Sequence, residues 1–123
     1  MSNVDNPTVL IIEDDFSLGV LFTTFLELDQ ITSNVCRFGK DAIQRLDDGE
    51  IKPKMVILDM HLPDMEGADI FEHLREHHPN IAIMIVTADV ALYGKFRKLH
   101  RDTYNKPMDM VDFRAAALKA LPA

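Results

Sequence analysis

The side chains of this chain that could do chemistry together stand where strand-like segments end, and they are Glu13, Asp14, Asp59, Thr87 and Lys106. Three of them are carboxylates, and at a separation of about 5 Å in an effective dielectric of about 20 each pair repels by about 3 kcal/mol. Either some of these acids are protonated or a cation sits among them, and oxygen-only ligands favour a hard ion such as Mg²⁺. The lysine and the threonine can contact phosphoryl oxygens. The set therefore predicts magnesium-assisted transfer of a phosphoryl group onto a carboxylate.

The segments that must position these residues are runs of apolar residues. Residues 8–12, 55–58 and 81–86 lack the alternation of a half-exposed strand, which is typical of strands covered on both faces. Shorter strands are expected near 32–37 and at 103–105. In a parallel sheet the carboxyl ends of all strands lie at one edge, where ligands bind in open α/β proteins. Residues far apart in the sequence should therefore converge there.

Helical spacing of apolar residues alternates with these strands. The predicted helices lie at about 16–28, 39–49, 67–79 and 90–100, and a last helix follows Asp109, which can cap it. Strand and helix thus alternate five times. This order predicts an α/β domain with a doubly wound, five-stranded parallel sheet and helices on both faces.

Composition and charge narrow the class of protein. At 123 residues, with 47% apolar and 27% charged residues, the chain has the size and composition of one globular domain. Its net charge of −7 opposes non-specific attraction to nucleic acid and to anionic membranes, and no apolar run approaches the roughly 20 residues of a membrane span. The single cysteine, Cys36, cannot form an internal disulfide, so we expect a reducing, cytoplasmic setting. We also expect a disordered N-terminus over 1–7, the domain over 8–121 and no effector domain in this chain.

Five short motifs occur together over most of the chain. In order, they are Glu13-Asp14, Asp59, Leu62–Gly67, Thr87-Ala88 and Lys106-Pro107. Each motif is weak alone, but the set resembles the receiver domains of two-component response regulators, including chemotaxis-type receivers. The resemblance implies a flavodoxin-like (βα)5 fold with the strand order 2-1-3-4-5.

The resemblance also assigns roles to the acids. It implies that Asp59 accepts a phosphoryl group from a phosphohistidine on a sensor kinase or phosphotransfer protein. Asp14 and Asp59 are then direct ligands of Mg²⁺, Glu13 assists through water, and the backbone carbonyl of His61 is a further ligand. The chain is expected to turn over no separate substrate, because it phosphorylates and dephosphorylates only itself at Asp59.

Thr87 and Lys106 are implied to contact the phosphoryl oxygens, with a cis peptide bond between Lys106 and Pro107. Phosphorylation then pulls Thr87 inward and changes the surface formed by the fourth helix, the fifth strand and the fifth helix. That surface is expected to bind a downstream protein or effector domain, or a second copy of the chain.

Two departures from the family pattern fall on this switching surface. Lys106 follows Thr87 by 19 positions, about three fewer than is usual in the family. The three missing residues amount to nearly one helical turn. Thr103 stands where most members carry an aromatic switch residue, and Tyr104 follows it. Period-two alternation places Tyr104 on the face of Lys106. We therefore predict unusual coupling to the output, with Thr87, Thr103 and Tyr104 as switch residues.

Other functions share the expected architecture. A pseudo-receiver that never takes phosphate usually lacks the acceptor, the acids or the lysine, and all three are present. A haloacid-dehalogenase-like phosphatase needs an aspartate two residues after its nucleophile, where this chain has His61. A flavodoxin-like FMN binder needs a hydroxyl- and glycine-rich first loop, where acids stand here. His73 and His77 match the zinc-protease pattern H-x-x-E-H, but no third ligand is evident, so a solvated helix face is favoured.

Overall fold

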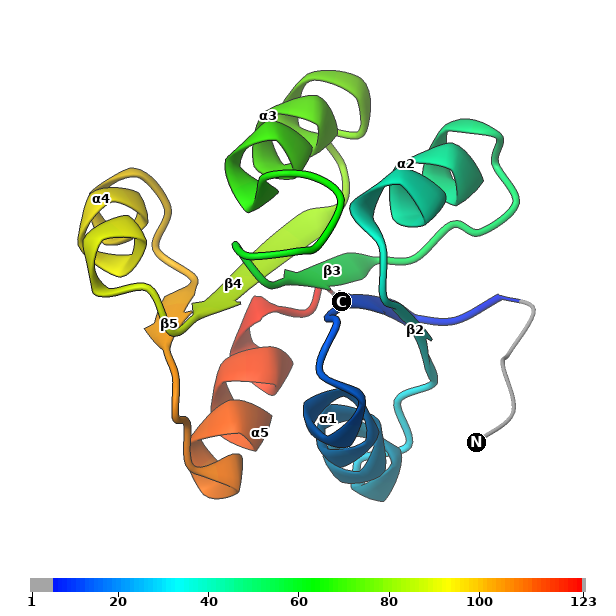
Figure 1. Ribbon diagram of the computed structural model, residues 1–123. Coiled ribbons are helices and arrows are strands. Elements are labelled where there is room, and N and C mark those ends of the chain that lie inside the picture. The colour runs from blue at the N-terminus through cyan, green and yellow to red at the C-terminus, as the bar shows by residue number, and fades with distance from the viewer. Residues whose placement is uncertain (1–5, 123) are drawn as a thin grey trace.

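A computed structural model describes residues 6–122, so most of the segment 1–7, predicted to be disordered, lies outside the described residues. Five strands form one parallel sheet in the order β2-β1-β3-β4-β5 (Figure 1). Their bounds are β1 Val9–Ile12, β2 Ser33–Cys36, β3 Met55–Leu58, β4 Ala82–Thr87 and β5 Thr103–Asn105. The predicted fold class and strand order are confirmed.

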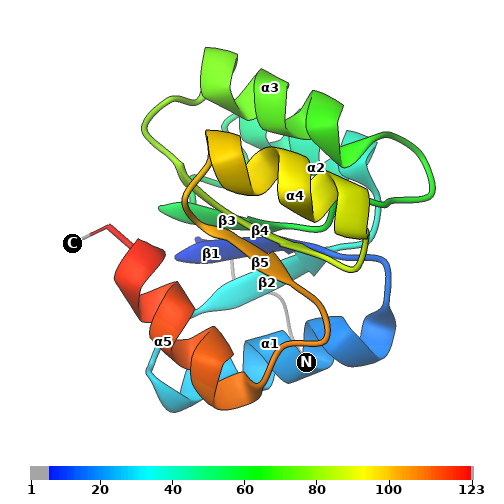
Figure 2. The ribbon, with the colours of Figure 1, turned by 90° about the vertical axis from the view of Figure 1, so that its left-hand side faces the viewer.

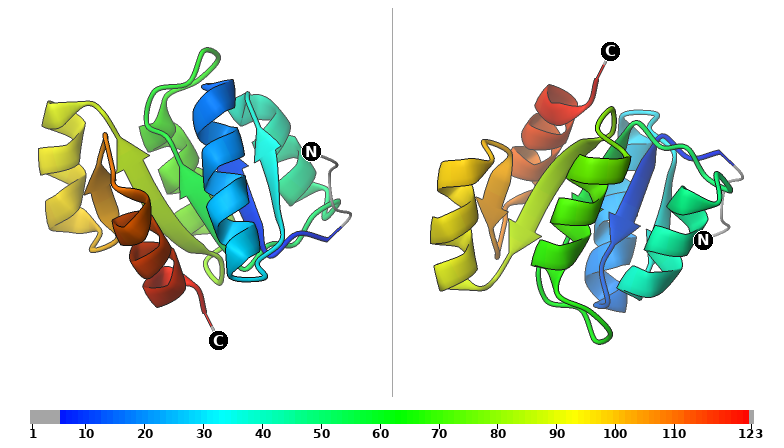
Figure 3. Two further views of the ribbon diagram at one scale, coloured as in Figure 1. Left: turned by 90° about the horizontal axis from the view of Figure 1, so that it is seen from below. Right: turned by 90° about the horizontal axis from the view of Figure 1, so that it is seen from above.

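Helices cover both faces of this sheet. Their bounds are α1 Phe16–Leu28, α2 Gly39–Asp47, α3 Gly67–His77, α4 Val90–Leu99 and α5 Met110–Ala120. In Figures 1 and 2, α1 and α5 lie on one face and α2, α3 and α4 on the other, so that the sheet is the middle of three layers. The two views of Figure 3 each show one of these helix layers in front of the strands. Over residues 6–122, none of the helices has the length and apolar character needed to cross a membrane.

Two hydrophobic cores, one on each face of the sheet, explain the unbroken apolar runs. In β1, Leu10 and Ile12 pack with buried residues of α2, α3 and α4, whereas Val9 and Ile11 pack with those of α1 and α5. All four side chains are fully buried, and each such burial stabilises the fold by about 1.5–3 kcal/mol. A strand with alternating polar residues would leave one of these cores unfilled.

Aspartates begin three of the helices. Asp15, Asp89 and Asp109 each accept a backbone N–H of the following helix with a side-chain oxygen, at the starts of α1, α4 and α5. The predicted cap at Asp109 is confirmed. Because these helices follow β1, β4 and β5 in a parallel sheet, their N-termini all lie at the edge where the predicted site stands.

Candidate functional site

The three predicted acids meet at the carboxyl edge of the sheet. Ile12 of β1 pairs with Leu58 of β3, and the N–H of Asp59 donates to the carbonyl of Ile12 at 3.0 Å. The residues that follow these two strands are therefore neighbours. One carboxylate oxygen from each of Glu13, Asp14 and Asp59 lies within 4.8 Å of the other two. The sheet register thus brings together acids that are more than forty positions apart in the sequence.

Lys106 reaches the same cluster from beyond β5. Its Nζ donates to Glu13 Oε1 at 2.8 Å and lies 3.6 Å from Asp59 Oδ2. Its backbone N–H donates to the carbonyl of Thr87 at 2.8 Å, and its peptide bond to Pro107 is cis, as the resemblance implied. The side chains of Glu13 and Asp59 are only 3% and 8% exposed. The lysine therefore compensates acids that are almost out of contact with water.

This cluster holds more negative than positive charge. Burial is the main reason why the pKa of Glu13 rises from 4.5 to about 7; the hydrogen bond from Lys106 lowers it, and the charge of Asp59 raises it. One ammonium thus leaves the acids incompletely compensated. A divalent ion would supply the missing charge, and an oxygen-only set of this kind suits Mg²⁺. The donor set at this edge therefore fits the magnesium ion that was predicted for it.

Thr87, the last residue of β4, and His61, in the loop after β3, stand beside the acids. Thr87 is fully buried at the end of β4, and its Oγ1 accepts the N–H of Asp89 at 3.1 Å. The N–H of His61 donates to Asp59 Oδ1 at 3.2 Å, and its imidazole Nε2 lies 2.7 Å from Asp89 Oδ2. The hydrogen bond with Asp89 raises the pKa of His61. This pair joins the β3–α3 loop to the β4–α4 loop, and strand-end reasoning does not predict it, because the contact depends on how far the two side chains reach from their loops.

The Leu62–Gly67 segment connects the site to α2. Phe38, the residue before α2, provides no side-chain cap, and Asp64 instead accepts the N–H groups of Gly39 and Lys40, each at 2.8 Å. These amides lower the pKa of Asp64, and its charge faces the positive end of the helix. The loop that follows Asp59 therefore supplies the cap of a helix that precedes it by 25 positions, which the sequence pattern did not predict.

Gly67 allows α3 to begin against the backbone that follows β3. Its N–H donates to the carbonyl of Met60 at 3.0 Å. A Cβ at this position would lie 2.4 Å from the Cα of Met60 and 2.9 Å from the carbonyl oxygen of Asp59. Both are backbone atoms, so a side-chain rotation cannot relieve the clash. A glycine is therefore needed for the loop after Asp59 to keep this position.

A family profile matches nearly the whole chain. It is described as the response regulator receiver domain, and it matches residues 9–117. This chain belongs to the response regulator receiver domain family. Receiver domains are signalling domains of two-component systems, characteristically phosphorylated on an aspartate, and they work with kinases or phosphotransfer proteins and with effectors.

Known proteins that this receiver domain resembles include regulators of different length. The regulatory protein LuxO of Vibrio cholerae is 34% identical over 77 residues, which cover 63% of this chain and 16% of LuxO. The receiver domain thus spans less than a fifth of the length of that relative. Sporulation initiation phosphotransferase F of Bacillus subtilis is 26% identical over 120 residues, which cover 95% of each chain. The solved structure of the non-phosphorylated HemR receiver domain from Leptospira biflexa has a TM-score of 0.80 at 22% identity, covers 95% of both chains and shows the same fold.

The predicted switch residues of β5 lie away from the acids. β5 pairs with β4 in an uninterrupted register, so neighbouring side chains of β5 face opposite sides of the sheet. Thr103 is fully buried on the side of α4, where its Oγ1 donates to the carbonyl of His100 at 2.7 Å. Tyr104 instead packs against the core beneath α1 and α5. Thr103, three positions before Lys106, is therefore held beneath α4.

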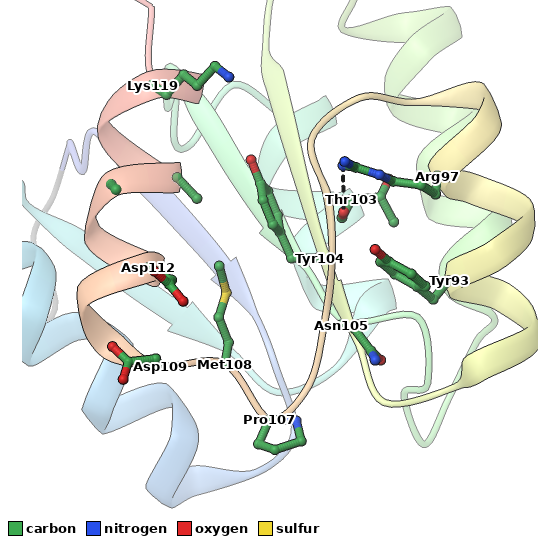
Figure 4. Close-up of a pocket in the computed structure, with 12 residues that line it drawn as sticks. Tyr93, Arg97, Thr103, Tyr104, Asn105, Pro107, Met108, Asp109, Asp112 and Lys119 are labelled. Carbon is green, nitrogen blue, oxygen red and sulfur yellow. Dashed lines mark hydrogen bonds between the residues drawn. The ribbon is translucent and has the colours of Figure 1, made fainter.

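An open groove of about 460 Å³ lies between α4, β5 and α5 (Figure 4). Tyr93 and Arg97 line it from α4, and Arg97 donates to the carbonyl of Thr103 at 3.3 Å, the dashed line in the figure. Figure 4 shows Tyr104 and Tyr93 on opposite sides of the β5 segment. The groove is therefore lined by side chains from both faces of the edge strand.

Proposed function

We propose that Asp59 accepts the phosphoryl group that switches this receiver domain, from a phosphohistidine on a sensor kinase or a phosphotransfer protein. The position of the Asp59 carboxylate carries the proposal. One of its oxygens receives the N–H of His61, the other lies 3.6 Å from the Nζ of Lys106, and the acids of the β1 end adjoin it. An aspartate so placed has a cation, a donor and metal ligands around the point where phosphorus would bond.

The transfer exchanges one bond to phosphorus for another. An oxygen of Asp59 attacks the phosphorus, the P–N bond to the histidine of the donor breaks, and the imidazole leaves with the bonding electrons and takes up a proton. Lys106 holds positive charge beside the phosphoryl oxygens, and the hydroxyl of Thr87 donates to one of them. Such chemistry depends mainly on positioning and on charge compensation, which the buried strand ends provide.

Asp14 and Asp59 would hold Mg²⁺ directly, with Glu13 acting through water and the carbonyl of His61 as a further ligand. When bound, the ion compensates the charge of the acids and of the phosphoryl oxygens. The hydrogen bond between Asp59 and the N–H of His61 orients the carboxylate, because it fixes one of its two oxygens. The chain is itself the substrate of this phosphorylation and turns over no separate substrate. We place this activity in the cytoplasm.

The phosphoryl group then acts as a local charge that changes the surface formed by α4, β5 and α5. Thr87 moves toward the new oxygens, and because its carbonyl accepts the N–H of Lys106, the movement is passed to the end of β5. Thr103 and Tyr104 respond on the two faces of that strand. The groove between α4 and α5 consequently changes its affinity for a downstream protein, an effector domain or a second copy of the chain.

Acetyl phosphate with Mg²⁺ tests the proposal, because it is a small phosphoryl donor that needs no partner. The native chain should gain the mass of one phosphoryl group, and Asp59→Asn should not. Asp15→Asn is the matched control: Asp15 lies on the same edge but caps α1, a role that asparagine can also fill, so this variant should gain the group like the native chain. Transfer from a phosphorylated histidine phosphotransfer protein would then establish the class of donor.

Equal mass gain in Asp59→Asn and in the native chain would refute the assignment of Asp59. Steady release of phosphate from a phosphomonoester by the native chain would refute the statement that it turns over no separate substrate.

A further inference from the structure

A second cluster of ligand-type side chains lies on the layer formed by α2 and α3. Asp47 is the last residue of α2, His73 stands in α3, and His78 is the C-cap that follows the last residue of α3. The Nε2 atoms of His73 and His78 lie 2.9 Å and 2.7 Å from the same oxygen, Asp47 Oδ1. One ligand atom from each of the three residues lies within 4.8 Å of the other two. His73 and His78 are 26 and 31 positions from Asp47 in the sequence, and the packing of α2 against α3 brings them together (Figure 1).

The donor chemistry of this cluster differs from that of the acids at the sheet edge. Two imidazole nitrogens and one carboxylate form a set that suits Zn²⁺ and related transition ions, whereas oxygen-only sets suit Mg²⁺. Zinc sites of three protein ligands keep further positions for water. The side chains of Asp47, His73 and His78 are 40%, 27% and 20% exposed, so an ion can enter from solvent and retain water.

The surroundings of the cluster favour a cation for a second, independent reason. Asp47 and His78 stand at the C-terminal ends of α2 and α3, and each helix carries partial negative charge at that end. A divalent ion would therefore meet one full negative charge and two helix ends of the same sign.

We propose that Asp47, His73 and His78 bind one Zn²⁺ ion, which joins the C-terminal ends of α2 and α3. Each neutral imidazole needs only to carry its proton on Nδ1, which leaves the lone pair of Nε2 for the metal. The present contacts of 2.7–2.9 Å between these nitrogens and Asp47 open slightly to admit the ion. The pattern H-x-x-E-H pointed to His73 and His77, but the partner of His73 is His78, which the helix end turns toward Asp47.

This inference does not rest on the proposed function, because Asp47, His73 and His78 stand on α2 and α3 and not at the strand ends that carry the acids. A zinc ion here would instead hold α2 at its far end. The near end of α2 is held by Asp64 of the β3–α3 loop, so α2 would be fixed to that loop at one end and to the C-terminal end of α3 at the other.

Titration calorimetry of the metal-free chain with Zn²⁺ tests the site, with excess Mg²⁺ present so that the acids at the sheet edge do not take the zinc. We expect one equivalent per chain, and a loss of affinity of more than about tenfold in each of Asp47→Asn, His73→Gln and His78→Gln. His77→Gln is the matched control, because its ring lies 4.5 Å from that of His73 but outside the cluster, and it should keep native affinity. Unchanged affinity in His73→Gln and His78→Gln would overturn the proposal, and so would half an equivalent per chain with formation of a zinc-linked dimer.

Long-range ¹H–¹⁵N spectra of the histidine rings make the test independent of whether any variant folds. One equivalent of Zn²⁺ should shift the ring nitrogens of His73 and His78 together and leave those of His61 and His100 in place. Ring signals of His73 and His78 that do not move would refute the site. Phosphorylation by acetyl phosphate should be the same in Asp47→Asn as in the native chain, so that failure of the zinc site and failure of the Asp59 proposal are separate results.

Discussion

Lys106 lies closer to one buried carboxylate than to the other: its Nζ is 2.8 Å from Glu13 Oε1 and 3.6 Å from Asp59 Oδ2. The shorter contact ties the lysine to the end of β1, while the longer one leaves room beside Asp59. The arrangement places the ammonium near the carboxylate of Asp59 without a close hydrogen bond between them. In the proposed phosphorylated state, the group on Asp59 can therefore take the lysine as its partner.

Replacing this lysine should slow phosphorylation far more than it changes the fold. We expect Lys106→Gln to lower the rate of transfer from acetyl phosphate to Asp59 by about a hundredfold, because one positively charged donor at the transferring group is lost. The rate is measured by mass spectrometry over time. Lys119→Gln, which removes the same charge on α5, should keep the native rate, and a native rate in Lys106→Gln would contradict the role given to that residue.

The stability of the metal-free chain should depend on the pH through Glu13. The unfolded chain releases the proton of Glu13 near pH 4.5, whereas the folded chain holds it until about pH 7. The free energy of unfolding should therefore fall as the pH rises between these values, by up to about 3 kcal/mol for the full shift. Urea unfolding of the native chain and of Glu13→Gln, compared below about pH 5 and above about pH 7.5, isolates this contribution.

The glutamine variant cannot ionise and should lack this part of the pH dependence. Mg²⁺ should reduce the loss of stability in the native chain above neutral pH, because it compensates the ionised carboxylate. Identical pH dependence in the two metal-free chains would show that Glu13 ionises as easily in the folded chain as in the unfolded one.

Two glycines should respond in opposite directions to the same substitution. Gly67→Ala drives a Cβ against the backbone of Met60 at 2.4 Å, so we expect a loss of about 2 kcal/mol or more and displacement of the loop after Asp59. Gly94→Ala lies inside α4, and apart from its chain neighbours and the backbone of its own helix no atom is within 4 Å of the new Cβ, so this variant should gain about 1 kcal/mol. Thermal unfolding distinguishes the two, and a Gly67→Ala chain as stable as the native one would mean that the β3–α3 loop can move without cost.

The cap that Asp64 provides should be needed for the first turn of α2. Asp64→Ala leaves the N–H groups of Gly39 and Lys40 without their partner, so the melting temperature should fall by a few degrees and both amides should exchange faster. Asp64→Asn keeps a side-chain oxygen and should lose much less. Equal amide exchange in the alanine variant and the native chain would show that water replaces the carboxylate without loss.

The sequence was sufficient to predict the parts of the site that follow from strand ends. Unbroken apolar runs before Glu13 and Asp59 indicated strands buried on both faces, and parallel strands must end at a common edge. The family resemblance implied the strand order, which is confirmed, and it also implied roles for the individual residues, which stay predictions. Where periodicity alone was used, it was less exact: Leu21 has the spacing of the buried stripe of α1 but is 39% exposed.

Contacts between loops could not be predicted in this way. His61 meets Asp89, and His78 meets Asp47, across 28 and 31 positions of the chain. Each of these contacts depends on how far a side chain extends from its loop or helix end and on the angle between two elements. Periodicity reports which face of an element is apolar, but it carries no information on either quantity.

The double burial of the strands limits how the chain can change. Since neighbouring residues of β3 belong to different cores, an insertion or deletion of one residue in this strand would exchange Val56 and Leu58 with Met55 and Ile57 across the sheet. The same shift would displace Asp59 from Glu13. The spacing of the acids is thus tied to strand length as strictly as the packing of the interior, so a change in the length of the chain should disturb the site least in the connections at the opposite edge of the sheet.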